Sequence, residues 1–224
     1  MKKLRRILFY LLGQLVLVAG LTLSTKVNLG VSAILSVAYS ASVITGAPIG
    51  NTSLVVYVVC VIAQIIIHLS KKFQDRDRRK LILADLLQLP LSLVFTRVMN
   101  LFASLLPNLT GSLLVRVPLL LLAIVFVGIG AAMTLDMRII PNPADGIVQA
   151  ISDVSGIKLG LAKNIVDFSC VVLTTVGSLI LAHRVIGIHV GTLLSMVGTG
   201  RVIALFNRVM AGHIREIMGE EQGL

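Results

Sequence analysis

The chain is poor in the residues on which most soluble enzymes and metalloproteins depend. Only 13% of its 224 residues are charged, and it has two cysteines and no tryptophan. It contains no P-loop, no Gly-x-Ser-x-Gly and no His-Glu-x-x-His sequence. Cys60 and Cys170 each lie inside an apolar run, where a disulfide framework is not expected, and no metal-binding spacing of Cys or His occurs. We therefore expect no enzyme activity, no metal and no cofactor.

Apolar residues dominate instead. They make up 56% of the chain, the mean hydropathy is +0.98, and uncharged runs extend over 7–25 and 117–135. The first run is longer than the core of a secretory signal, so it is interpreted as an uncleaved helix. At roughly 20 residues a span, the composition predicts an all-α polytopic membrane protein with about six transmembrane helices.

The net charge of +10 is concentrated at two places. Ten of the twenty Lys and Arg residues lie at 2–6 and 71–80, next to apolar runs. Such clusters are typical of cytoplasmic segments that lie next to anionic lipid, so a nucleic-acid partner is not expected. The distribution predicts a multi-pass protein of the cell membrane with its N- and C-termini in the cytoplasm.

A short phrase occurs twice in the chain. Thr45–Gly50 and Ser155–Gly160 both have the form [Ser/Thr]-Gly-x-x-x-Gly, and Cys60 and Cys170 keep the same offset of 110 residues. We therefore expect two repeats in one membrane domain, over 1–108 and 112–215. Internal duplication in a very hydrophobic chain is typical of transporters, whose substrate site lies between the repeats.

Each repeat contains one element that is too short to cross a bilayer. Segment 31–44 would be about 21 Å long as a helix, against a hydrocarbon core of roughly 30 Å. Its counterpart is 143–155. Both are predicted to be re-entrant half-helices, which leaves three crossings in each repeat and inverts the second repeat relative to the first. The crossings are expected at 4–25, 51–70, 81–103, 117–135, 159–182 and 188–210.

The starts of the half-helices are candidate binding positions. Asn142 suits an N-cap, Pro143 suits the first helical position, and Ser32 is the N-cap candidate of the first half-helix. Unpaired N–H groups at such ends favour an anion or a carboxylate. Asp167, inside the fifth span, either pairs with Lys163 one turn before it or belongs to a substrate or proton path. The predicted substrate-binding residues are Asn28, Ser32, Tyr39, Tyr57, Asn142, Asp145, Gln149 and Asp167.

Several of these phrases resemble a known family. The run Lys26–Ser32, its echo Asn142–Gly146 and Gly191–Leu194 are similar to those of the YczE/YitT-like bacterial integral membrane proteins. The resemblance extends along nearly the whole chain and implies a membrane protein or transporter without indicating a substrate.

The leading hypothesis is a secondary transporter of a small polar organic solute. Two alternatives stay open. One is a substrate-binding membrane subunit that needs an energising partner, and the other is a non-transporting membrane scaffold for an enzyme. Beyond the lipid bilayer and the solute, a second copy of the chain or a partner subunit is a possible partner.

Overall fold

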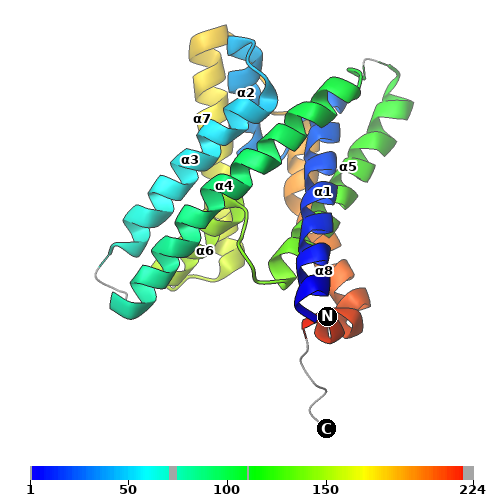
Figure 1. The fold of residues 1–224 in the computed structure, drawn as a ribbon. Helices are drawn as coiled ribbons and strands as arrows, with labels where there is room; N and C mark the ends of the chain where they lie inside the picture. The colour runs from blue at the N-terminus through cyan, green and yellow to red at the C-terminus, as the bar shows by residue number, and fades with distance from the viewer. Residues whose placement is uncertain (1, 71–74, 110, 219–224) are drawn as a thin grey trace.

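A computed structural model describes residues 2–70, 75–109 and 111–218 (Figure 1). Eight helices and no strands occur in this part of the chain. They are α1 (Lys2–Val27), α2 (Ala33–Thr45), α3 (Ile49–His68), α4 (Asp75–Leu105), α5 (Leu113–Asp136), α6 (Pro143–Ser155), α7 (Leu159–Ala182) and α8 (Val190–Met218). Residues 71–74 of the basic 71–80 segment lie outside the described residues, so the structure does not place that part of the segment.

Six of the helices are long and apolar enough to cross a membrane, and α2 and α6 are not. The two short helices have 13 residues each, about 20 Å at 1.5 Å per residue. The all-helical polytopic class with six spans is thus confirmed for the described residues. α4 begins earlier than the predicted third span because Asp75–Lys80 continues the helix ahead of the apolar run. α8 likewise continues past the predicted end of the sixth span, to Met218.

The backbone repeats with the same offset of 110 residues as the sequence. Asn28 and Arg138 both adopt left-handed conformations, with φ of 53° and 47°. Gly46 and Gly156, which end the two short helices, both have φ of 72°. Since a non-glycine residue rarely adopts positive φ, its recurrence at Asn28 and Arg138 indicates that the fold of the second repeat reproduces that of the first.

The hydrogen bonds around these turns repeat as well. Ser42 donates through Oγ to the Ala47 carbonyl at 2.7 Å, and Ser152 donates to the Ile157 carbonyl at 2.8 Å. In both turns a hydroxyl residue one position before the glycine also binds a carbonyl in the preceding turn of helix. The [Ser/Thr]-Gly-x-x-x-Gly phrase therefore encodes a reversal of the chain from a short helix into a long one.

α1 and α5 pack against each other in opposite directions and form the contact between the repeats. Arg6 near the start of α1 donates through Nε to the Met137 carbonyl beyond the end of α5, at 2.8 Å. Arg116 near the start of α5 donates to the Val27 carbonyl at the end of α1, also at 2.8 Å. Each arginine satisfies carbonyls that a helix end leaves unpaired, where a positive charge is also favoured. The reciprocal bonds require antiparallel helices, so the two halves are inverted relative to each other.

Glycines allow this pair of helices to approach closely. A Cβ added at Gly20 would lie 2.7 Å from the Val127 nitrogen, and one added at Gly130 would lie 2.6 Å from the Cα of Leu17. The two contacts are equivalent under the 110-residue offset. Small residues at such crossings are the usual means of packing helices in a membrane.

The short helices cross over between the repeats. α2 packs against α7 and α6 packs against α3, so each lies on a long helix of the other half. Ser36 on α2 contacts Thr174 on α7 through their hydroxyls at 2.8 Å. At the equivalent place Gln64 on α3 donates to the Pro143 carbonyl at 3.3 Å and fills the space beside Gly146. At one crossing two side chains of similar size face each other, Ser36 and Thr174. At the other, the longer Gln64 faces a glycine, Gly146.

The repeats differ most in their last two long helices. α3 and α4 pack along each other and are joined by a pair between His68 Nδ1 and Asp85 Oδ2 at 2.6 Å. The equivalent helices α7 and α8 have no comparable contact within the described residues. Gly50 shows the contrast directly, because an added Cβ would collide with α4, whereas nothing lies within 4 Å of one added at its counterpart Gly160.

Candidate functional site

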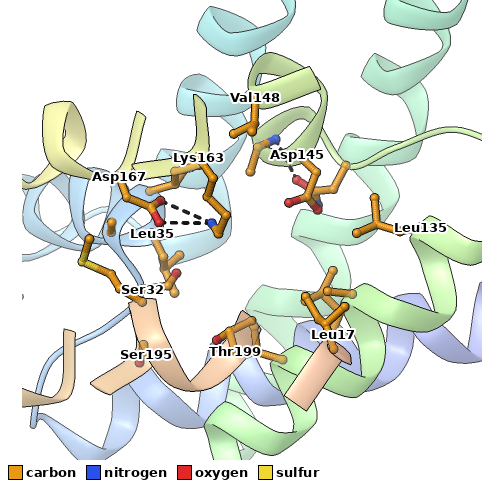
Figure 2. A pocket seen from close by; sticks show the side chains of 18 of the residues that line it. Leu17, Ser32, Leu35, Leu135, Asp145, Val148, Lys163, Asp167, Ser195 and Thr199 are labelled. Atoms are coloured by element: carbon orange, nitrogen blue, oxygen red, sulfur yellow. Dashed lines mark hydrogen bonds and ion pairs between the residues drawn. The ribbon is translucent and has the colours of Figure 1, made fainter. Parts of the chain in front are cut away.

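A cavity of about 280 Å³ lies where the first turns of α2 and α6 meet (Figure 2). α1 and α5 supply an apolar wall that includes Leu17, Leu21 and Val127, and α7 and α8 supply the other walls. The lining reaches Leu159 and Gly160, which are exposed, at the place where α7 and α8 are not packed together. The space therefore opens between the two helices that the second repeat leaves apart.

The chain reaches this place by turning back after a long helix. α1 ends at Val27, Asn28 turns the chain in a left-handed conformation, and α2 then starts at Ala33 beside the cavity. In the second repeat Arg138 makes the same turn and α6 starts at Pro143 (Figure 1). Both short helices thus have their positive ends at the cavity and run away from it.

The two helix starts differ chemically, and α6 is fully capped. The Asn142 side chain accepts a hydrogen bond from the Ala144 N–H at 3.0 Å, and the Asn142 carbonyl accepts from the N–H groups of Asp145 and Gly146. Pro143 has no N–H. The predicted N-cap is confirmed, but the predicted anion site at this end is wrong because no free N–H group remains and Asp145 adds a carboxyl to the first turn.

α2 begins without a side-chain cap. Ser32 occupies the N-cap position, yet its hydroxyl makes no capping bond, so the predicted cap is absent. The Ser32 carbonyl accepts from the Ser36 N–H at 2.8 Å, while the N–H groups of Ala33 and Ile34 have no partner among the described residues. Ala33 and Ile34 are buried and line the cavity. Unpaired buried N–H groups are costly, so this end favours a hydrogen-bond acceptor from a ligand.

Three charged side chains line the cavity. Lys163 Nζ lies 3.1 Å from Asp167 Oδ2, with the Asp167 side chain 5% and the Lys163 side chain 38% exposed. This is the predicted pair one turn apart. Asp145 lies near enough to interact electrostatically with both, but it accepts no hydrogen bond from a side chain of the described residues. Figure 2 shows Lys163 extending between the two carboxyl groups.

Ser195 on α8 was not singled out from the sequence. It is 5% exposed and lines the cavity, and its hydroxyl has no hydrogen-bond partner among the described residues. Figure 2 places Ser195 and Ser32 on one side of the cavity and Asp145 on the other. A single serine in an apolar helix gives no local signal, because only the packing of α8 against α5 turns it toward the cavity.

The cavity brings together six of the eight predicted substrate-binding residues, namely Ser32, Tyr57, Asn142, Asp145, Gln149 and Asp167. Tyr57 interacts with the Asn142 side chain. Asn28 and Tyr39 lie elsewhere. Asn28 is exposed at the end of α1, where its carbonyl accepts from Arg116, and Tyr39 packs beside Gly187 one turn further along α2 than the cavity extends. The structure therefore does not bring Asn28 and Tyr39 together with the other six residues.

Within the described residues no group of three or more His, Cys, Asp or Glu side chains is arranged to hold a metal ion. Four buried polar residues of α3 and α4 pair with one another across the two helices. His68 pairs with Asp85, and Gln88 Nε2 donates to Gln64 Oε1 at 2.9 Å. Asp85 and Gln88 thus contribute to the contact between two helices, outside the cavity.

The fold and the cavity define a polytopic α-helical membrane protein with an internal polar site between two inverted halves. The sequence model of a family of unknown function (DUF6198) matches residues 4–208, so the chain belongs to that family. No curated protein and no solved structure matches the chain. The family match does not bear on the YczE/YitT-like resemblance, which stays a prediction.

Proposed function

We propose that this protein is a secondary transporter of a small polar organic solute in the cell membrane. The observation that carries the proposal is the cavity at the junction of two oppositely directed short helices, between two inverted repeats. Broken or discontinuous helices that meet between inverted repeats are where secondary transporters bind their substrates. The cavity also contains acidic and basic side chains that would be costly in a purely structural membrane core.

The difference between the repeats supports a transport cycle. α3 is closed on α4, whereas α7 is apart from α8 beside the cavity. In an inverted-repeat transporter the two halves exchange such conformations, and the site then opens to the other side. If the basic N-terminus is cytoplasmic, the exposed residues Leu159 and Gly160 are at the cytoplasmic end of α7, and the proposed cycle then includes a state open toward the cytoplasm.

The proposal is tested by uptake into proteoliposomes. A panel of radiolabelled amino acids, hydroxy acids and methylated amines supplies the candidate solutes. Saturable uptake of at least one of them is expected, and the double variant Asp145→Asn, Asp167→Asn should reduce it at least tenfold. Asp153→Asn is the matched control, because Asp153 is exposed on the same helix as Asp145.

One result would contradict the proposed transport, and a second would contradict the role of the two carboxyl groups. Uptake that is no greater than in protein-free vesicles across the panel would contradict transport by this chain alone. Undiminished uptake by the double variant would remove both carboxyl groups from the mechanism. Binding without uptake would favour a substrate-binding subunit, and absence of both would favour a membrane scaffold.

A further inference from the structure

Apart from the Lys163–Asp167 pair, the cavity has hydrogen-bond donors on one side and the Asp145 carboxyl group on the other. On one side, the uncapped start of α2 presents the N–H groups of Ala33 and Ile34, and the Ser195 hydroxyl lies beside it without a partner. Ser32 and Ser195 also line the same small adjoining hollow, which confirms that they are close. The positive end of a helix dipole together with free donors favours a carboxylate at this place.

The other side carries a carboxyl group without a counterion of its own. Asp145 accepts no hydrogen bond from a side chain of the described residues, and the one nearby cation, Lys163, is held by Asp167 at 3.1 Å. With their usual charges, the three side chains sum to −1. A carboxylate in a membrane interior is costly unless a cation compensates it, so this side favours an ammonium group.

A ligand of a single sign satisfies only one side of the cavity. An anion at the start of α2 would share the cavity with Asp145, and a simple cation at Asp145 would leave the α2 donors unpaired and meet Lys163. A ligand that carries both a carboxylate and an ammonium group satisfies both sides at once. Its charges would also sum to zero, which leaves the cavity no more charged than before.

Size and the apolar wall restrict the ligand further. The cavity volume of about 280 Å³ is at the lower end of the roughly 300–1,000 Å³ that is usual for small-molecule sites. Leu17, Leu21 and Val127 present an apolar surface between the two polar sides. This arrangement suits a small zwitterion with a short apolar side chain.

We propose that the cavity binds a small zwitterionic solute of the amino-acid type, with its carboxylate at the start of α2 and Ser195 and its ammonium group at Asp145. The proposal rests on the proposed function in so far as the bound solute is taken to be the cargo. Binding itself is measured without transport, so the two can fail separately.

The test is a titration of the purified full-length chain by isothermal calorimetry with three molecules that share one isobutyl side chain. Leucine has both charged groups, 4-methylpentanoate lacks the ammonium group and 3-methylbutylamine lacks the carboxylate. Leucine should bind saturably, and each truncated analogue should bind at least about tenfold more weakly, because a charge-assisted hydrogen bond is lost in each case. Alanine, valine and phenylalanine extend the test to other side-chain sizes.

Variants assign the two ends of the ligand. Ser195→Ala should weaken leucine and 4-methylpentanoate and leave 3-methylbutylamine unchanged. Asp145→Asn should weaken leucine and abolish its advantage over 4-methylpentanoate, whereas Asp153→Asn should change neither. Ser195→Ala and Asp145→Asn are both small substitutions. Retention of the thermal transition of the parent protein shows that each variant is folded.

The outcomes separate this proposal from the proposed function. Failure of all four amino acids to bind folded protein, or equal binding of leucine and either truncated analogue, overturns the zwitterion assignment. If uptake of another polar solute persists in that case, the transport proposal stands. If leucine binds with the expected pattern but no solute is taken up, the zwitterion site stands and transport by this chain alone is excluded.

Discussion

Gly50 and Gly160 occupy the same position in the two repeats but have opposite surroundings. Each is the second residue of a long helix, α3 or α7. A Cβ at Gly50 would collide with the Thr96 carbonyl and lie 2.6 Å from Asn100 Oδ1, which accepts the Gly50 N–H at 2.6 Å. At Gly160 nothing lies within 4 Å. The same alanine substitution at the two sites therefore measures how closed each helix pair is.

The expected effects differ in sign. Gly50→Ala forces α3 away from the α4 backbone, which costs about 1–3 kcal/mol, and weakens a hydrogen bond worth about 0.5–1.5 kcal/mol. Replacing glycine in a helix returns up to about 1 kcal/mol, so a net loss of about 1–3 kcal/mol is expected. Gly160→Ala keeps only the favourable contribution. In a chain of this size the loss corresponds to a fall in Tm of about 2–12 °C, and Gly160→Ala should leave Tm unchanged or slightly higher.

Thermal unfolding of the purified variants measures the stability difference, and uptake into proteoliposomes measures the effect of each substitution on transport. If α7 closes on α8 during transport as α3 is closed on α4 here, Gly160→Ala should slow uptake even though the protein is no less stable. Equal Tm changes at the two positions would refute the assignment of an open and a closed helix pair. Full uptake by Gly160→Ala, and by the bulkier Gly160→Val, would refute closure of α7 on α8 as a step of the cycle.

Three further predictions concern the fold. Gly146→Ser should lower stability by about 1–3 kcal/mol, because the serine side chain would meet the Gln64 amide, and adding Gln64→Thr should restore most of the loss. The free energies of unfolding of the two single variants and the double variant test this, and additive losses would contradict it. Arg116→Ala should cost about 1–3 kcal/mol in the same assay, since it removes charge-assisted bonds to the end of α1, and a change below about 0.5 kcal/mol would contradict the account. Thr45 and Ser155 are exposed at the ends of the two short helices. Replaced singly by cysteine in a background without the native cysteines, they should react with a membrane-impermeant thiol reagent from opposite sides of the membrane. Labelling of both from the same side would contradict the inverted topology.

Local sequence signals predicted the elements well. The length of the two short segments identified α2 and α6, and the Asn142-Pro143 pair identified the start of α6 because capping depends on adjacent residues only. Ser32 shows where such reasoning ends. A serine at the N-cap position can place its hydroxyl in other directions, and the surrounding helices, which the sequence does not specify locally, left α2 uncapped.

Only part of the site could be predicted from the sequence. Asp145 was found because a carboxyl group suits the first turn of a helix, and Asp167 because charged residues are rare in apolar spans. Ser195 could not be, because one serine among small residues in α8 looks the same whether it faces lipid or a cavity. The open α7–α8 pair was also hidden, since the two repeats share their pattern of elements and differ in tertiary packing.

The two reciprocal arginines have a mechanical consequence. Sliding α1 along α5 in either direction would break the Arg6 bond at one end and the Arg116 bond at the other together, and the interlocked Gly20 and Gly130 contacts resist the same displacement. The α1–α5 pair is thus fixed in register and forms the static part of the fold. Any motion that opens and closes the cavity therefore has to be made by the other helices, relative to this pair.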